Sequence, residues 1–97
     1  MTWKLWLDDQ LDSVRPVPSG YIGAASSEEA IALVDQLGSP EFMDLDHDLG
    51  GEDNAMRFLR YLSNIVEVPP GYVVHSRNPC GKENIVSFME SWKKSLE

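Results

Sequence analysis

The sequence predicts a small three-layer α/β domain with a mostly parallel sheet of about four strands and three helices. Short apolar segments with strand-like alternation are separated by longer segments in which apolar residues recur at helical spacing. Single helices between successive strands are typical of right-handed crossovers and parallel sheets. A length of 97 residues fits one domain, which we expect to span residues 1–97.

Four segments are predicted to form the strands. Residues 3–7 (WKLWL) and 41–46 (EFMDLD) alternate in character, residues 72–75 (YVVH) are rich in β-branched side chains, and residues 21–24 (YIGA) make a short further strand. Prolines and a glycine between positions 16 and 20 predict a loop between the first two strands.

Three segments are predicted to be helical. Ser26 and Glu29 form a capping box before the first helix, which Gly38 ends. Asp53 or Asn54 caps the second helix, and the prolines at 69 and 70 cannot continue it. The last helix is expected from about residue 82 to residue 95.

Composition restricts the possible partners. The net charge of −8 argues against binding along a nucleic-acid backbone, which needs Lys and Arg. It allows a small phosphorylated ligand held by a metal ion or by backbone amides. No apolar run approaches the ~18 residues of a membrane span, and the first residues do not resemble a signal peptide. With Cys80 as the single cysteine we expect a cytoplasmic protein, either a monomer or a homodimer formed through an exposed sheet edge.

Ionisable side chains are densest at the end of the third predicted strand, in residues 44–48 (DLDHD). Burying four such groups together is costly unless a cation, a proton or a substrate compensates them. Two other predicted strands also end in polar clusters, at residues 8–9 and 75–78. Because open α/β sheets bind ligands at the carboxyl ends of their strands, the three clusters should converge on one site.

These clusters resemble those of response-regulator receiver domains, with an acidic pair after the first strand and an aspartate ending the central strand. Residues 45–50 (LDHDLG) and 74–81 (VHSRNPCG) look like two signatures of the narrower cyclic-phosphate-processing receiver-like family. The resemblance covers nearly the whole chain and implies a flavodoxin-like, receiver-like sheet. That sheet is truncated, because the sequence lacks a helix between the first two strands and the final strand with its lysine. Signalling by aspartyl phosphorylation would need that lysine.

The resemblance implies that Asp8, Asp9 and Asp46 hold a divalent metal, and we expect Mg²⁺ because it prefers oxygen ligands such as carboxylates. Alternatively, Asp8 and Asp9 form a solvated turn after the first strand. The alternative for Asp46 is that its side chain caps the following loop. His47 and His75 are the two histidines of the sequence. Opening a cyclic phosphate needs a base for water and an acid for the leaving oxygen, so we predict this pair as catalytic together with Asp46. Each histidine taken alone is more often a structural imidazole.

Residues near the last predicted strand are expected to bind the phosphate. Ser76, Arg77 and Asn78 offer a hydroxyl, a cation and an amide, and Asp48 either orients His47 or caps the loop. Asn78 followed by proline is also a common start of a helix. Three further residues keep open roles: Asp44, Cys80 and Arg15.

The leading functional hypothesis is a phosphoesterase that hydrolyses a cyclic phosphate on a nucleotide or an RNA end. One alternative is binding or sequestration of a cyclic nucleotide or phosphorylated signal without cleavage. A second alternative is a receiver-like protein-interaction module.

Overall fold

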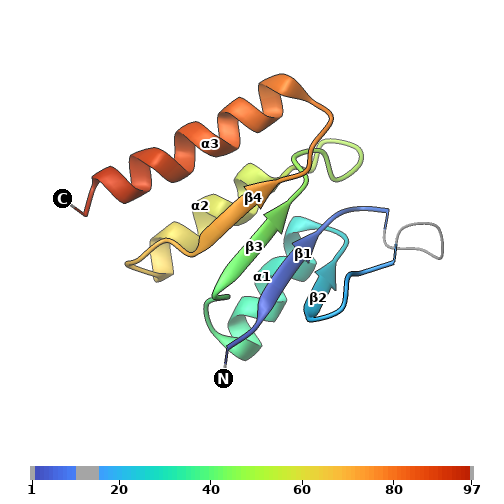
Figure 1. Cartoon of the computed structure of the whole chain (residues 1–97), viewed down its shortest axis with the longest axis horizontal. Helices are drawn as coiled ribbons and strands as arrows, with labels where there is room; N and C mark the ends of the chain where they lie inside the picture. Colours follow the sequence, from blue (N-terminus) through green and yellow to red (C-terminus); the bar gives the residue numbers. More distant parts are fainter. Residues whose placement is uncertain (1, 11–15, 97) are drawn as a thin grey trace.

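The computed structural model describes residues 2–10 and 16–96. Its elements follow the predicted order of strands and helices. They are β1 (Lys4–Leu7), β2 (Tyr21–Ala24), α1 (Ser27–Leu37), β3 (Phe42–Leu45), α2 (Ala55–Ile65), β4 (Gly71–Val74) and α3 (Pro79–Lys94) (Figure 1). No helix of these two ranges is long and apolar enough to cross a membrane.

The four strands form one sheet in the order β2-β1-β3-β4, and every neighbouring pair is parallel. Leu7 at the end of β1 lies beside Ala24 and Leu45, and Leu45 lies beside Val74. All four strands therefore end at the same edge of the sheet. The predicted α/β class, with a four-stranded parallel sheet and three helices, is confirmed.

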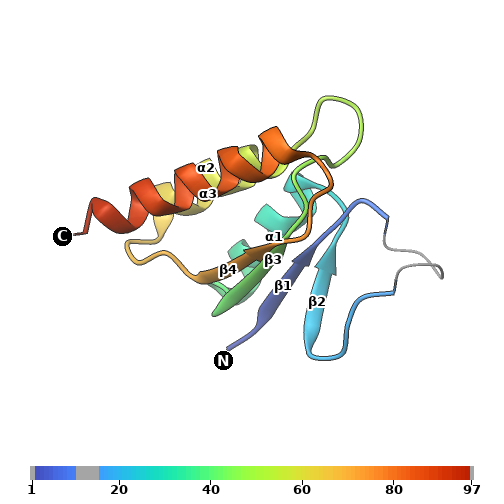
Figure 2. The ribbon, with the colours of Figure 1, turned by 45° about the horizontal axis from the view of Figure 1, so that its top comes forward.

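The helices of the described chain cover one face of this sheet, so the expectation of three layers is corrected to two (Figures 1 and 2). Leu5, Leu7, Met43 and Leu45 point toward the helices and are fully buried. The alternate side chains, on the other face, are half-buried or exposed; they include Lys4, Trp6, Tyr21, Phe42, Asp44 and Val73.

Right-handed crossovers explain this arrangement. The connections from β2 to β3 and from β3 to β4 step in the same direction along the sheet, so both carry their helix on the same side. The step from β1 to β2 runs in the opposite direction and would place a helix on the other side. The described parts of that connection, residues 8–10 and 16–20, contain no helix.

Side chains at the helix starts fix where each helix begins. Ser26 accepts a hydrogen bond from the Glu29 amide at 3.1 Å, as the predicted capping box requires. Asn54 caps α2 by accepting from the amide of Met56 at 2.9 Å. The last helix begins at Pro79 rather than near Lys82, because Asn78 acts as its N-cap and proline suits the first helical position.

Candidate functional site

A polar cleft of about 410 Å³ lies at the edge of the sheet where the strands end. The three predicted clusters meet there. Its lining consists of Asp9, Gln10, Asp46, Asp48, Gly50, His75, Ser76, Arg77 and Asn78.

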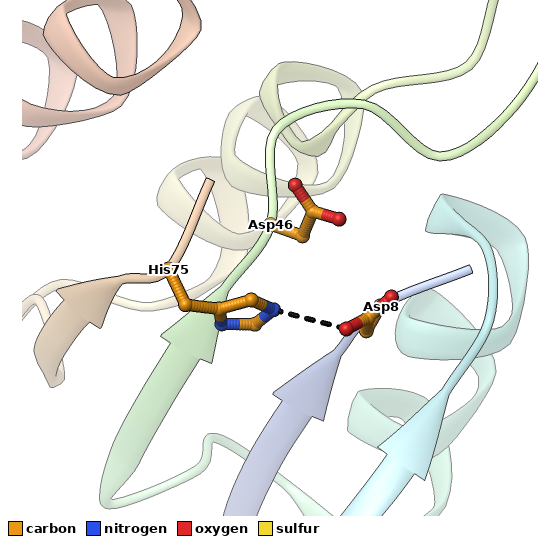
Figure 3. Close-up of side chains that lie close together, drawn as sticks. All are labelled: Asp8, Asp46 and His75. Atoms are coloured by element: carbon orange, nitrogen blue, oxygen red, sulfur yellow. Dashed lines mark hydrogen bonds and ion pairs between the residues drawn. The ribbon is translucent and has the colours of Figure 1, made fainter. Parts of the chain in front are cut away.

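Backbone hydrogen bonds place the first residues after β1, β3 and β4 side by side at the edge of the sheet. The amide of Asp8 donates to the carbonyl of Ala24 at 3.0 Å, that of Asp46 to Leu7 at 2.9 Å, and that of His75 to Leu45 at 2.9 Å. These bonds continue the parallel ladder by one residue. Asp46 therefore lies between Asp8 and His75 at the sheet edge (Figure 3).

Asp8, Asp46 and His75 form a group that can bind a metal ion. Each offers one ligand atom, and the three atoms lie within 4.8 Å of one another. Asp8 is completely buried, and its Oδ2 lies 3.3 Å from Nε2 of His75. The sequence predicted Asp8 and Asp46 as metal ligands. The structure adds His75 to this group, and it places Asp9 beside it in the lining of the cleft.

The electrostatic surroundings of Asp46 favour a positive partner. Burial raises the pKa of its carboxyl group above the ordinary value, and the nearby carboxylates of Asp8 and then Asp9 raise it further. His75 acts in the opposite direction and lowers the pKa. A cation at this point would compensate the repulsion between the carboxylates.

His75 is held on both sides by its neighbours in the sheet. Its Nδ1 lies 2.6 Å from Oδ1 of Asp44, and its ring stacks on the indole of Trp6 with centroids 4.3 Å apart and planes 6° from parallel. Asp44 had no predicted role. Its signal in the sequence is the alternation of β3, which places Asp44 and Asp46 on the same face.

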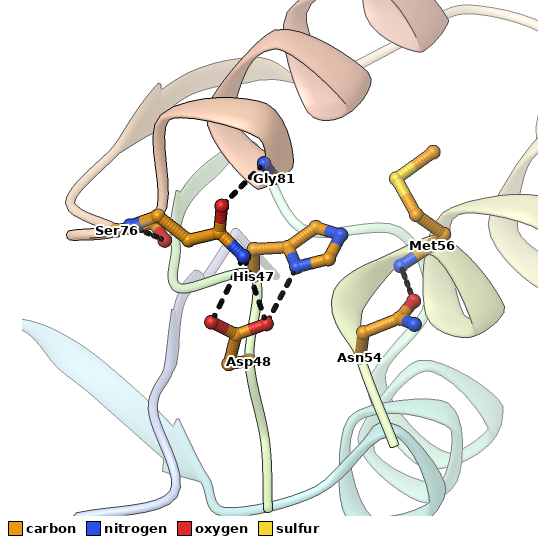
Figure 4. Close-up of polar contacts among 7 residues, drawn as sticks. His47, Asp48, Asn54, Met56, Ser76 and Gly81 are labelled. Carbon is orange, nitrogen blue, oxygen red and sulfur yellow. Dashed lines mark hydrogen bonds and ion pairs between the residues drawn. The ribbon is translucent and has the colours of Figure 1, made fainter. Parts of the chain in front are cut away.

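A second polar cluster is centred on Asp48 (Figure 4). Asp48 and Asn78, which belong to it, also line the cleft. Oδ1 of Asp48 lies 2.9 Å from Nδ1 of His47, and the Asn78 amide group donates to Oδ2 at 3.2 Å. These two hydrogen bonds, first the one from His47, lower the pKa of the Asp48 carboxyl group. Asn78 also accepts from the amide of Gly81 at 3.1 Å.

The ring of His47 is packed against the first turn of α3 instead of facing the cleft. His47 is 9% exposed and is not among the described residues that line the cleft. An added Cβ at Gly81 would lie 2.4 Å from Cγ of His47, so only glycine fits there. Of the two histidines that were predicted to act together, His75 is in the described lining of the cleft and His47 is outside it.

The remaining predicted residues surround the opening of the cleft. Ser76 accepts from the amide of Asn78 at 3.1 Å, and Arg77 is the one positively charged side chain among the described lining residues. Cys80 is exposed on the first turn of α3 and is not part of the described lining. Arg15 lies outside the described residues.

The fold and the acidic edge of the sheet define a receiver-like α/β domain. The sequence profile of the cyclic-phosphate processing receiver domain matches residues 3–91. The chain thus belongs to this family, as the two sequence signatures predicted.

Two solved chains match this structure. One belongs to a fusion that carries the yeast Spc42 trimeric coiled coil, amino acids 181–211. The match has a TM-score of 0.57 and 14% sequence identity, and it covers 98% of this chain and 80% of the other. The comparison with curated proteins gave no match.

Proposed function

We propose that this domain is a metal-assisted phosphoesterase that hydrolyses a cyclic phosphate on a nucleotide or an RNA end. The observation that carries the proposal is the Asp8, Asp46 and His75 group at the base of a polar cleft. Membership in a family named for cyclic-phosphate processing supports the choice of substrate.

The residues of this group fit a divalent ion. Two carboxylates and one imidazole are common metal ligands, and atoms within 4.8 Å of one another can share one ion. Burial raises the pKa of the Asp46 carboxyl group first, and the neighbouring carboxylates of Asp8 and Asp9 raise it further, so a cation placed beside them would meet favourable charge. When bound, a divalent ion would polarise the phosphate and lower the pKa of a bound water.

The other lining residues suit the handling of a phosphate. The guanidinium of Arg77 can pair with phosphate oxygens in a bidentate manner, and the hydroxyl of Ser76 can donate to one of them. Hydrolysis adds water to phosphorus and breaks one ring P–O bond, so a proton must leave the water and another must reach the leaving oxygen. Asp9 lines the cleft and can serve one of these transfers, and water in the cleft can serve the other. His75 would not transfer a proton, because Asp44 holds its Nδ1 and the ion would occupy its Nε2.

His47 has a supporting role in this proposal. Its hydrogen bond to Asp48 holds a carboxylate that lines the cleft, and its ring stays against α3. His47 is therefore a positioning residue, and His75 is the histidine of the metal group.

The test is incubation of the full chain with 2′,3′-cyclic, 3′,5′-cyclic and cyclic-oligonucleotide phosphates. Each reaction is run with Mg²⁺, with Mn²⁺ and with a chelator, and the products are identified by mass spectrometry. We expect ion-dependent ring opening of one substrate class, reduced at least about 100-fold in Asp46→Asn and His75→Ala. Asp35→Asn, which makes the same charge change on α1, should keep full activity. Unimpaired turnover in both site variants would overturn the proposal.

Binding without cleavage is the second candidate. It is favoured by the burial of His47, because this leaves one imidazole among the described lining residues where a two-histidine mechanism needs two. Tight retention of one cyclic phosphate, recovered chemically intact with and without divalent ions, would support binding over catalysis.

A further inference from the structure

We propose that Asp44 is a positioning residue that directs Nε2 of His75 at Asp8 and Asp46, which completes a site selective for a first-row transition ion over Mg²⁺. The inference rests on the proposed function for the location of the metal. It goes further in assigning Asp44 and in naming the class of ion.

Asp44 keeps a hydrogen on Nδ1 of His75. A carboxylate only accepts hydrogen bonds, so Nδ1, which lies 2.6 Å from Asp44, must donate. Nε2 faces Oδ2 of Asp8 at 3.3 Å, and a bound ion would take the place of any hydrogen on this second nitrogen. This is the arrangement in which metal-bound histidines donate their second N–H to a carboxylate.

The sheet fixes the orientation of the His75 ring. Asp44 and His75 point from neighbouring strands to the uncovered face, and the parallel stack on Trp6 prevents the ring from tilting. Asp44 and His75 have side-chain exposures of only 16% and 18%, so water competes weakly for their hydrogen bond. A ligand held in this way loses little conformational entropy when an ion binds.

The donor set determines the choice of ion. Mg²⁺ prefers oxygen ligands and keeps several waters, whereas imidazole suits zinc, cobalt and the other first-row ions. A site made of carboxylates alone would already bind Co²⁺ somewhat more tightly than Mg²⁺. The imidazole of His75, held by Asp44, should increase this ratio of Co²⁺ to Mg²⁺ affinity. The increase is what the variants of His75 and Asp44 measure.

The first experiment measures binding of Co²⁺ alone and Mg²⁺ alone by calorimetry. The full chain carries Cys80→Ser, so that the exposed thiol cannot bind cobalt. Asp44→Asn should lower Co²⁺ affinity about 10–100-fold, as other losses of such partners do, and should leave Mg²⁺ affinity nearly unchanged. His75→Ala should remove the additional preference. Asp35→Asn is the charge-matched control, and it should change neither affinity.

The second experiment observes the His75 ring directly by proton NMR of the Co²⁺-loaded protein. A histidine that binds cobalt through Nε2 keeps its Nδ1–H, which gives a strongly shifted signal that disappears in D₂O. We expect this signal in the wild type, its absence in His75→Ala, and its broadening by faster exchange in Asp44→Asn.

Two results would overturn the inference: no shifted exchangeable signal in the Co²⁺-loaded wild type, or equal losses of Co²⁺ and Mg²⁺ affinity in Asp44→Asn. Neither result depends on turnover. A phosphoesterase that requires Asp46 but gives no such signal would keep the proposed function and lose this inference. A protein that selects Co²⁺ as expected but hydrolyses no cyclic phosphate would keep this inference and lose the proposed function.

Discussion

His47 and His75 each have a carboxylate at Nδ1, yet their surroundings give them different roles. The partner of His75 is Asp44 within the sheet, and its ring lines the cleft. The partner of His47 is the exposed Asp48, and its ring is buried beside Gly81. At the scale of single residues, packing of the rest of the ring decides whether an imidazole reaches the cleft or stays against a helix.

The contact between His47 and Gly81 gives a prediction about stability. In Gly81→Ala the new Cβ would lie 2.4 Å from Cγ of His47, so the buried ring or the helix must move. We expect a loss of about 1–3 kcal/mol, the usual cost of overpacking, measured by urea unfolding.

The same substitution in a His47→Ala background is the control. Without the imidazole the two closest contacts, to Cγ and Nδ1, are removed, although Cβ of residue 47 still lies 2.8 Å from the added methyl group. Alanine also has a higher helix propensity than glycine by about 1 kcal/mol. Gly81→Ala should then cost clearly less than it does beside the histidine. Equal losses in both backgrounds would show that the ring is not the cause.

At the scale of elements, Asp53 links the starts of α1 and α2. Its carboxylate accepts from the amide of Ser27 at 2.9 Å and from the hydroxyl of Ser27 at 2.5 Å. Ser27 is completely buried at the first position of α1. The Asp53 carboxylate thus accepts a hydrogen bond from an amide at the N-terminus of α1. Its negative charge also interacts favourably with the dipole of that helix.

Removal of this carboxylate should destabilise the fold. Asp53→Ala leaves two buried donors of Ser27 without their acceptor, and we expect a loss of about 2–3 kcal/mol in the free energy of unfolding. Asp35→Ala removes an exposed carboxylate on α1 that accepts from Tyr61, and it should cost less than about 1 kcal/mol. Similar losses in the two variants, measured by urea unfolding, would contradict the special role of Asp53.

Local signals in the sequence were sufficient for the element order but not for these links. The capping box at Ser26 and the alternation of β3 are encoded in neighbouring residues, and both were predicted correctly. Asp53 was expected to compete with Asn54 as a cap of α2. Its bond to Ser27 joins residues 26 positions apart, and such a contact exists only once the helices have packed.

At the scale of the whole molecule, the two-layer architecture determines where the site opens. Asp44, Trp6 and His75 lie on the face that the described helices leave uncovered, and there Asp44 and Trp6 hold the ring of His75. The convergence of the acidic clusters followed from the parallel sheet alone. The separation of His47 from His75 did not, because it depends on where the first turn of α3 lies against the loop after β3.

The raised pKa of Asp46 and the proposed ion site make the stability of the whole domain testable against pH and divalent ions. Because the pKa of the Asp46 carboxyl group is raised in the folded state, folding favours its protonated form. This contribution to stability is present below the ordinary pKa of an aspartate and is lost as pH rises through the raised value. Without divalent ions, Asp46→Asn should therefore equal or exceed the wild type at pH 7, by roughly 0.5 kcal/mol for a group this accessible to water.

With a divalent ion present, the wild type should become more stable than Asp46→Asn. An ion at 100 times its dissociation constant stabilises the wild type by about 2.7 kcal/mol, and Asp46→Asn, which lacks a ligand, should gain much less. Thermal unfolding of both proteins at pH 7, with chelator and then with Mn²⁺, measures this crossing. Asp35→Asn should follow the wild type in both conditions. An Asp46→Asn variant that is less stable in chelator, or that gains as much from Mn²⁺, would mean that Asp46 serves the fold and not the ion.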